Sequence, residues 1–123
     1  MIGSALASGP DPDGFDMFII KADQYGDTVW TKNIGGPDSD GGYTIIETSD
    51  GSYVACGNTV SYGAGDRDVW VVKLNASGDT LWTRTIGGSL EDSGQDIIEA
   101  SNGDLIILGD TKSFGAGSKD YYL

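Results

Sequence analysis

Residues 68–119 read DVWVVKLNASGDTLWTRTIGGSLEDSGQDIIEASNGDLIILGDTKSFGAGSK, and residues 16–67, 52 positions earlier, have a closely similar sequence. Gly78-Asp79-Thr80 falls on Gly26-Asp27-Thr28, and Ile86-Gly87-Gly88 falls on Ile34-Gly35-Gly36, with no gap. Nearly half of the aligned positions are identical. A fixed period of about 50 residues predicts a propeller or another repeat array.

Each unit is expected to hold four short antiparallel strands separated by turns. Apolar runs predict strands of the first unit at 16–22, 28–34, 43–48 and 52–59, with Gly26-Asp27 as the first turn. Asp50-Gly51 predicts a type I′ hairpin turn, which needs positive φ at both central positions. Asn102-Gly103 takes its place in the second unit, and this pair favours the same turn.

These units define the predicted domain organisation. We expect an all-β protein of β-propeller blades, with two full four-stranded antiparallel repeats at 16–67 and 68–119. Residues 1–15 resemble the tail of a preceding blade and its loop, and 120–123 resemble the first strand of a further blade. The partial strands suggest a chain cut inside a repeat at both ends. A β-sandwich is the main alternative, but it would not produce so regular an internal copy.

Four motifs carry a resemblance to a known class of repeats. They are Asp-x-Trp-Val-Val-Lys-Leu at 68–74, Ser-Gly-Asp-Thr-Leu-Trp-Thr-Arg-Thr-Ile-Gly-Gly at 77–88, Glu-Asp-Ser-Gly at 91–94 and Ser-Phe-Gly-Ala-Gly at 113–117. Together they resemble the β-propeller repeats of large secreted or cell-surface bacterial and archaeal proteins. The resemblance implies an extracellular or cell-surface propeller, often attached to adhesion or sorting modules and seldom with a defined activity.

The composition of the chain limits the classes of molecule that it is expected to bind. The net charge is −12, with no histidine and 20 glycines, and the pI is near 4.1. So acidic a surface would repel nucleic acid and anionic membranes and would accept cations or basic partners. No apolar run approaches the roughly 18 residues of a membrane span. Cys56 lies in an apolar strand pattern, which predicts a buried and inert thiol.

Strand direction predicts that many carboxylates share one rim of the blades. The loops 35–42 and 61–67 should lie at this rim, and the tight turns should lie at the opposite one. Clustered carboxylates beside glycine-rich backbone suit Ca²⁺, which takes about 6–8 oxygen ligands. The metal candidates are Asp38, Asp40, Asp66, Asp68, Glu91 and Asp92, with Asp11, Asp13, Asp16 and Asp120 at the same rim.

A structural role for these acids is the preferred interpretation. Asp40 and Asp92 recur at one position of the repeat, where an aspartate commonly accepts hydrogen bonds from loop amides. Asp16, Asp68 and Asp120 recur at the start of the first strand, where they could bind amides or a cation such as Arg67. Recurrence also predicts that Trp30 and Trp82 pack between blades instead of stacking on sugars.

The chain contains no visible catalytic set. Without histidine there is neither a Ser-His pair nor a Cys-His pair, so only carboxylate chemistry, as in glycosidases, remains. Asn75-Ala76-Ser77 matches a glycosylation acceptor, a short motif of little weight.

Two blades cannot cover both of their own faces, and this predicts self-association. Ile, Val and Trp side chains would meet water over more area than soluble monomers usually expose. We therefore expect a homo-oligomer, a trimer or tetramer, or else the missing blades of a longer parent chain. The favoured function is a non-enzymatic scaffold or binding surface for a protein or glycan. The alternatives are a carboxylate-dependent glycan hydrolase or lyase and a propeller fragment with no activity of its own.

Overall fold

The protein is all-β, as predicted, in the part of the chain that can be described. The computed structural model describes residues 2–6, 14–64, 66–115 and 120–122, and the side chains of 14–64 and 66–115. Neighbouring strands within each sheet are antiparallel. The strands are β1 (Ile2–Leu6), β2 (Phe15–Ala22), β3 (Thr28–Ile34), β4 (Asp40–Glu47), β5 (Tyr53–Thr59), β6 (Asp68–Leu74), β7 (Thr80–Ile86), β8 (Asp92–Glu99), β9 (Leu105–Thr111) and β10 (Asp120–Tyr122).

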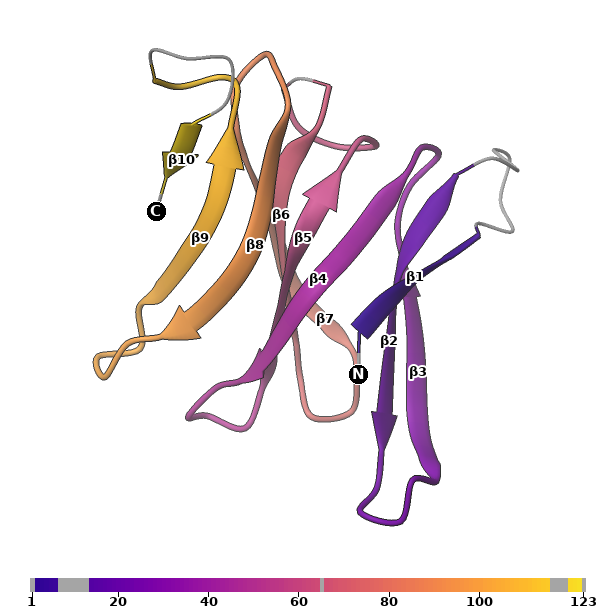
Figure 1. The fold of residues 1–123 in the computed structure, drawn as a ribbon. Helices are drawn as coiled ribbons and strands as arrows, with labels where there is room; N and C mark the ends of the chain where they lie inside the picture. Colours follow the sequence, from indigo (N-terminus) through magenta and orange to yellow (C-terminus); the bar gives the residue numbers. More distant parts are fainter. Residues whose placement is uncertain (1, 7–13, 65, 116–119, 123) are drawn as a thin grey trace.

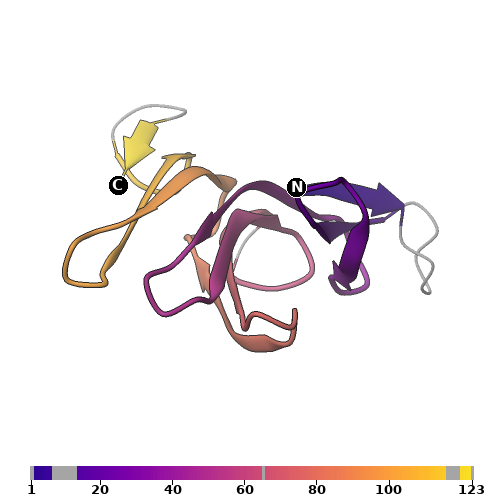
Figure 2. The ribbon, with the colours of Figure 1, turned by 90° about the horizontal axis from the view of Figure 1, so that it is seen from below.

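The strands form three sheets that stand side by side (Figure 1). The N-terminal sheet has the order β1-β2-β3, the central sheet β4-β5-β6-β7, and the C-terminal sheet β8-β9-β10. Seen from one end, the sheets fan out with their faces against one another (Figure 2). The chain passes from one sheet to the next after β3 and again after β7.

The sheets do not coincide with the predicted units 16–67 and 68–119. Each unit gives its first two strands to one sheet and its last two strands to the next. The hydrogen-bonded register explains the shift, because β5 pairs with β6 across the unit boundary, from Tyr53 opposite Leu74 to Thr59 opposite Asp68. The 52-residue period is retained, but the central sheet begins at Asp40 and the C-terminal sheet at Asp92, instead of at Asp16 and Asp68.

Two apolar cores lie between the sheets, and neighbouring residues of one strand serve different cores. The first core joins the N-terminal and central sheets through Met17, Ile19, Ala55, Trp70, Val72 and Leu74. The second core joins the central and C-terminal sheets through Val54, Cys56, Val69, Val71 and Ile97. Successive side chains of a strand point to opposite faces. A sheet covered on both faces therefore requires the continuous apolar runs seen in β5 and β6.

The tryptophans and the cysteine lie as predicted. Trp30 packs on the first core, 6.1 Å from the Tyr53 ring between centroids, and Trp82 packs on the second. Both therefore pack between sheets. Cys56 is fully buried, and burial followed by the charge of Asp96 raises the pKa of its thiol to about 11.

The hairpin turns differ from the predicted type I′ geometry. The Gly51 N–H donates to the Thr48 carbonyl and the Thr48 N–H donates to the Ser52 carbonyl. Gly51 has φ of +83°, but no described non-glycine residue has positive φ, so Asp50 does not fit a type I′ turn. The pattern is a type I turn closed by a glycine in the left-handed region. The carboxylate of Asp50 supports it by accepting the Thr48 hydroxyl and the Ser52 amide.

The strand predicted at 43–48 begins three residues earlier, at Asp40. Gly41 and Gly42 pair with β5, and the register shifts between Gly42 and Thr44. Gly57 allows this pairing, because a Cβ at that position would collide with the Gly41 backbone. A glycine, a residue type that usually breaks strands, is therefore needed at position 57 for the close approach of two backbones.

No described segment forms a helix long and apolar enough to span a membrane.

Candidate functional site

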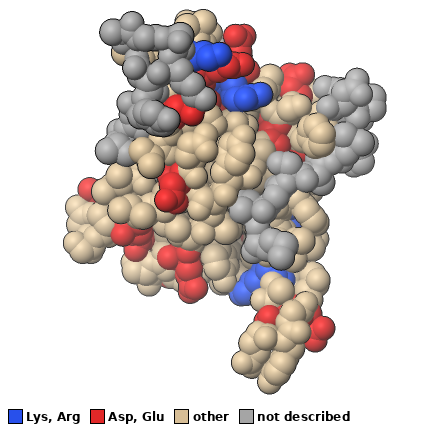
Figure 3. Space-filling model, in the orientation of Figure 1, with Lys and Arg blue, Asp and Glu red and all other residues tan. Residues whose placement is uncertain are grey.

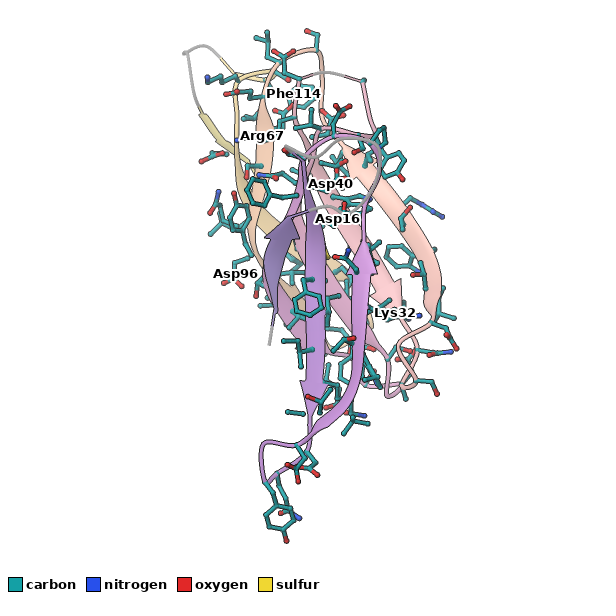
Figure 4. All side chains as sticks on the ribbon, turned by 90° about the vertical axis from the view of Figure 1, so that its right-hand side faces the viewer. Asp16, Lys32, Asp40, Arg67, Asp96 and Phe114 are labelled. Carbon is teal, nitrogen blue, oxygen red and sulfur yellow. The ribbon has the colours of Figure 1, made fainter. Side chains whose placement is uncertain are left out.

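The predicted rim exists, and all six metal candidates lie on or next to its connections. The connections that follow β3, β5 and β7 leave the same end of the sheets, called the rim here (Figure 1). Asp16, Asp40 and Arg67 lie toward this end in Figure 4. In Figure 3 charged atoms of both signs lie at this end, and further acidic and basic atoms lie across the middle and lower part of the same face. Asp11 and Asp13 lie outside the described residues, as does the side chain of Asp120.

Asp92 anchors the rim of the C-terminal sheet. Its carboxylate is 1% exposed and accepts hydrogen bonds from the Thr111 hydroxyl, the Ser113 hydroxyl at 2.6 Å and the Gly88 amide at 3.0 Å. Burial alone would raise the pKa of Asp92, but the hydrogen bonds from Ser113, Thr111 and Gly88 outweigh it and lower the pKa. A charged Asp92 thus ties two rim connections together.

Asp40 does the same one period earlier. It is 1% exposed and accepts the Thr59 hydroxyl, the Ser61 hydroxyl at 2.7 Å and the Gly36 amide at 2.8 Å. Ser61 in turn accepts the Asp38 amide at 2.9 Å. The predicted role of Asp40 and Asp92 as acceptors of loop amides is confirmed. Both oxygens of each carboxylate are engaged in holding loops.

Asp16 and Asp68 each keep one buried oxygen without a hydrogen-bond partner. The other oxygen of Asp68 accepts the Ala64 amide at 2.6 Å, and that of Asp16 accepts the Asn33 side-chain amide at 3.0 Å. The unpartnered Asp68 oxygen lies with an Asp92 oxygen beside Gly87, where a Cβ would collide with both. Asp68 therefore binds an amide, one of its two predicted kinds of partner.

The remaining metal candidates are dispersed. Asp38 and Asp66 are exposed, and Glu91 forms an ion pair with Lys112 at 2.7 Å. Within residues 14–64 and 66–115, no three carboxylate or cysteine side chains are placed to hold one metal ion. The rim brings together the pairs Asp16 with Asp40 and Asp68 with Asp92.

We expect the Asp16→Asn change to raise the free energy of unfolding at pH 7, because it removes a charge from a partly buried site beside Asp40. The gain should be at most about 1 kcal/mol, since Asp16 is partly exposed and solvent screens the repulsion between the two carboxylates. Burial and the charge of Asp40 raise the pKa of Asp16 above its usual 3.8, against the Asn33 hydrogen bond. The raised pKa favours the neutral form in the folded state, so stability is lost as the pH rises through that pKa. Urea titrations at pH 7 and pH 3 measure this gain.

The gain should vanish at pH 3, where the unfolded carboxyl is also protonated. The exposed Asp38→Asn change serves as the control. A destabilised Asp16→Asn protein at pH 7 would contradict the argument.

Two neighbouring cavities open near the rim between the sheets. Tyr43 and Arg67 line both cavities. The first cavity, of about 320 Å³, is also lined by Phe15, Ser39, Asp40, Gly41, Asn58 and Val60. The second, of about 350 Å³, is also lined by Glu91, Asp92, Ser93, Gln95, Asp110 and Lys112. Ligand sites in proteins usually have volumes of about 300–1,000 Å³.

The two cavities are one site repeated at a distance of 52 residues. Adding 52 to Phe15, Ser39, Asp40, Gly41, Tyr43, Asn58 and Val60 gives Arg67, Glu91, Asp92, Ser93, Gln95, Asp110 and Lys112, all of which line the second cavity. Only the aspartate is the same in both units, and six of the seven positions differ. The backbone of the site is therefore repeated, whereas its lining is not.

Tyr43 stands between the cavities with more than half of its side chain exposed. Its hydroxyl accepts the Asn58 side-chain amide at 3.2 Å, and the same amide group donates to the Ser93 hydroxyl at 3.1 Å. Arg67 is held by its backbone, since its carbonyl accepts the Asp92 amide at 2.6 Å. An amphipathic aromatic ring beside an exposed cation can contact both apolar and polar parts of a ligand.

Sequence reasoning missed Tyr43 and Arg67 as site residues. For Tyr43 the signal was present, because Gln95 replaces it in the second unit, whereas Arg67 gave no such signal, because Lys119 keeps a cation at the aligned position. Asn75, the candidate glycosylation acceptor, lies between β6 and β7, where its side-chain oxygen accepts the Ser77 and Asp79 amides.

No family model matches the chain. The chain is 28% identical over 116 residues to the regulatory protein FlaEY of Caulobacter vibrioides. That alignment covers 84% of this chain and 12% of FlaEY, so the chain corresponds to a small part of that protein.

Proposed function

We propose that this chain is a non-catalytic β-propeller-type module, outside the cell or at its surface, that presents a binding surface for a protein or glycan. The repeat resemblance supports the fold family and the location. The three sheets that pack face to face support a rigid scaffold. The paired rim cavities support binding.

A single observation carries the binding function. Positions that hold the scaffold repeat between the units, as with Asp40 and Asp92 or Thr59 and Thr111, whereas six of the seven cavity-lining positions change. A purely structural loop would meet the same demand in each unit and would keep similar residues. Variable side chains on a constant framework are typical of surfaces whose contacts are specific to a ligand.

The chemistry of the lining indicates a polar ligand with apolar patches. The first cavity offers the rings of Phe15 and Tyr43, which are 46% and 52% exposed. The second offers both signs of charge through Arg67, the Glu91–Lys112 pair and Asp110. Sugar rings and protein segments both match such a surface, since they combine hydrogen-bonding groups with apolar faces.

Replacing Tyr43 and Arg67 together by alanine should abolish binding to immobilised glycans and peptides. Fluorescently labelled protein would be applied to a glycan array and a peptide array, and the signals of the original chain and the variant compared. We expect at least a tenfold loss of the specific signals, because both cavities lose a shared wall.

Tyr25→Ala is the matched control, since Tyr25 is 82% exposed and lies in the β2–β3 turn at the other end of the sheets. It should bind like the original chain. An original chain whose signals never exceed those of the Tyr43 and Arg67 double variant would overturn the proposed function.

A further inference from the structure

The C-terminal sheet leaves an apolar face open. Ile98, Ile106 and Leu108 on β8 and β9 are 55%, 43% and 44% exposed. One period earlier the same positions are Ile46, Val54 and Cys56 on the central sheet. Val54 and Cys56 are fully buried there, and Ile46 packs against the same core. The exposed residues therefore belong to a face that is covered wherever this chain supplies the next sheet.

The structure also shows which kind of surface covers such a face. On the central sheet it is covered by Ile97, Leu105 and Ile107 of the next sheet. On the N-terminal sheet, Met17 and Ile19 are covered by the facing side of the central sheet, to which Ala55, Trp70 and Val72 contribute. Both interfaces thus place the same two sides of the repeat against each other.

The N-terminal sheet also has the face that, in the central and C-terminal sheets, covers the preceding sheet, and on the N-terminal sheet this face is open. Met17 and Ile19 point into the first core, so Phe18 and Ile20 between and beyond them point to the opposite face. Both are only partly buried, whereas their counterparts Trp70 and Val72 are 2% and 0% exposed. One chain therefore carries both complementary halves of a sheet-to-sheet interface, at opposite ends of its stack.

We propose that the open face of the C-terminal sheet is a docking surface for a second copy of this chain. The second copy presents the outer face of its N-terminal sheet, with Phe18 and Ile20 meeting Ile98, Ile106 and Leu108 of the first. The contact continues the stack by the same packing that already joins the three sheets. It is a head-to-tail contact, so it extends to a closed ring or to an open series of copies.

Size-exclusion chromatography with light scattering tests this interface on the full chain. The original chain should elute with a mass of at least two copies. Ile106→Asp and Phe18→Asp should each have the mass of one copy, because either change places a charge in the contact. Leu81→Asp adds the same charge at a 52% exposed position of β7 outside both faces, and it should keep the original mass.

Mixing the two disrupted variants separates a head-to-tail contact from other modes of association. Ile106→Asp retains an intact N-terminal sheet face and Phe18→Asp retains an intact C-terminal sheet face, so an equimolar mixture should give a discrete pair. Phe18→Ala removes only the ring and should reduce the mass without the folding risk of a charge, with circular dichroism as the check on folding.

Three results would contradict docking of a second copy. A monomeric original chain at all accessible concentrations would overturn the proposal and would assign the open face to a different occupant. Retention of the original mass by both Ile106→Asp and Phe18→Ala would also overturn it. A mixture that stays at the mass of one copy would exclude the head-to-tail arrangement.

Discussion

Trp70→Ala is expected to lower the free energy of unfolding by about 3–5 kcal/mol. Trp70 is 2% exposed at the centre of the first core, where its ring lies 5.7 Å from that of Tyr62. Truncation removes a large apolar area from the interface of two sheets, and the paired backbones of both sheets keep the surrounding side chains from collapsing into the cavity. Urea denaturation followed by circular dichroism measures the loss.

Trp70→Phe is the matched comparison and should cost less than about 1.5 kcal/mol, since it largely preserves the packing. The repeat supports this expectation because Phe18 occupies the same position in the first unit. The indole N–H of Trp70 is buried with no hydrogen-bond partner. Removing this N–H therefore offsets part of the free energy of unfolding that is lost with the smaller ring. Equal losses for Trp70→Phe and Trp70→Ala would contradict the packing argument.

Asp92→Ala is expected to destabilise the protein by about 3 kcal/mol at pH 7, because hydrogen bonds to a charged group contribute about 1.5–3 kcal/mol each and act together here. The change leaves the Thr111 and Ser113 hydroxyls and the Gly88 amide without their acceptor. Urea denaturation at pH 7 measures this loss, with the exposed Asp38→Ala as a control that should change stability by less than about 0.5 kcal/mol.

The same residue should make stability depend on pH. The pKa of Asp92 is lower in the folded state than its usual 3.8, so its contribution is present above pH 3.8 and is lost as the pH falls through the folded value. The difference between the original chain and Asp92→Ala should therefore shrink below pH 3.8. A difference that stays constant from pH 7 to pH 2.5 would show that Asp92 does not act through its charge.

The repeat explains why so much of the architecture could be predicted. Aligned turns at Gly26, Gly51, Gly78 and Gly103 bound the strands, and all four glycines have positive φ. Near-continuous apolar runs at 16–22 and 68–74 predict strands covered on both faces; β6 does lie between the two cores, whereas β2 contributes to the first core alone. The turn glycines and the apolar runs, which occur once in each unit, therefore indicate where the strands lie and which loops share the rim.

The grouping of strands into sheets could not be read from the repeat. A periodic sequence has no intrinsic starting point, so a unit that begins at Asp16 and one that begins at Asp40 have the same period. The partner of each strand is decided by long-range backbone pairing, here between β5 and β6 across the unit boundary. The turn type was likewise decided by backbone angles that Asp50 does not adopt.

The candidate site was predictable only in part. Repetition identified Asp40 and Asp92 as structural acceptors, because both occur at one position of the repeat. Repetition hid Tyr43, since a search for recurring residues does not select a position where Gln95 replaces it, and the sequence alone does not place Arg67 beside Tyr43. The cavities became visible only when folding placed residues from connections 24 or more positions apart, such as Tyr43 and Arg67, beside each other.

Nuclear Overhauser effects between backbone protons test the central claim, that each sheet is built from the halves of two units and stacks on its neighbours. We predict strong cross-strand contacts between Cys56 and Val71 and between Asn58 and Val69, which pair across β5 and β6. Side-chain contacts should also join Ile97 to the second core. Cross-strand contacts between β3 and β4, with none between β5 and β6, would contradict the account.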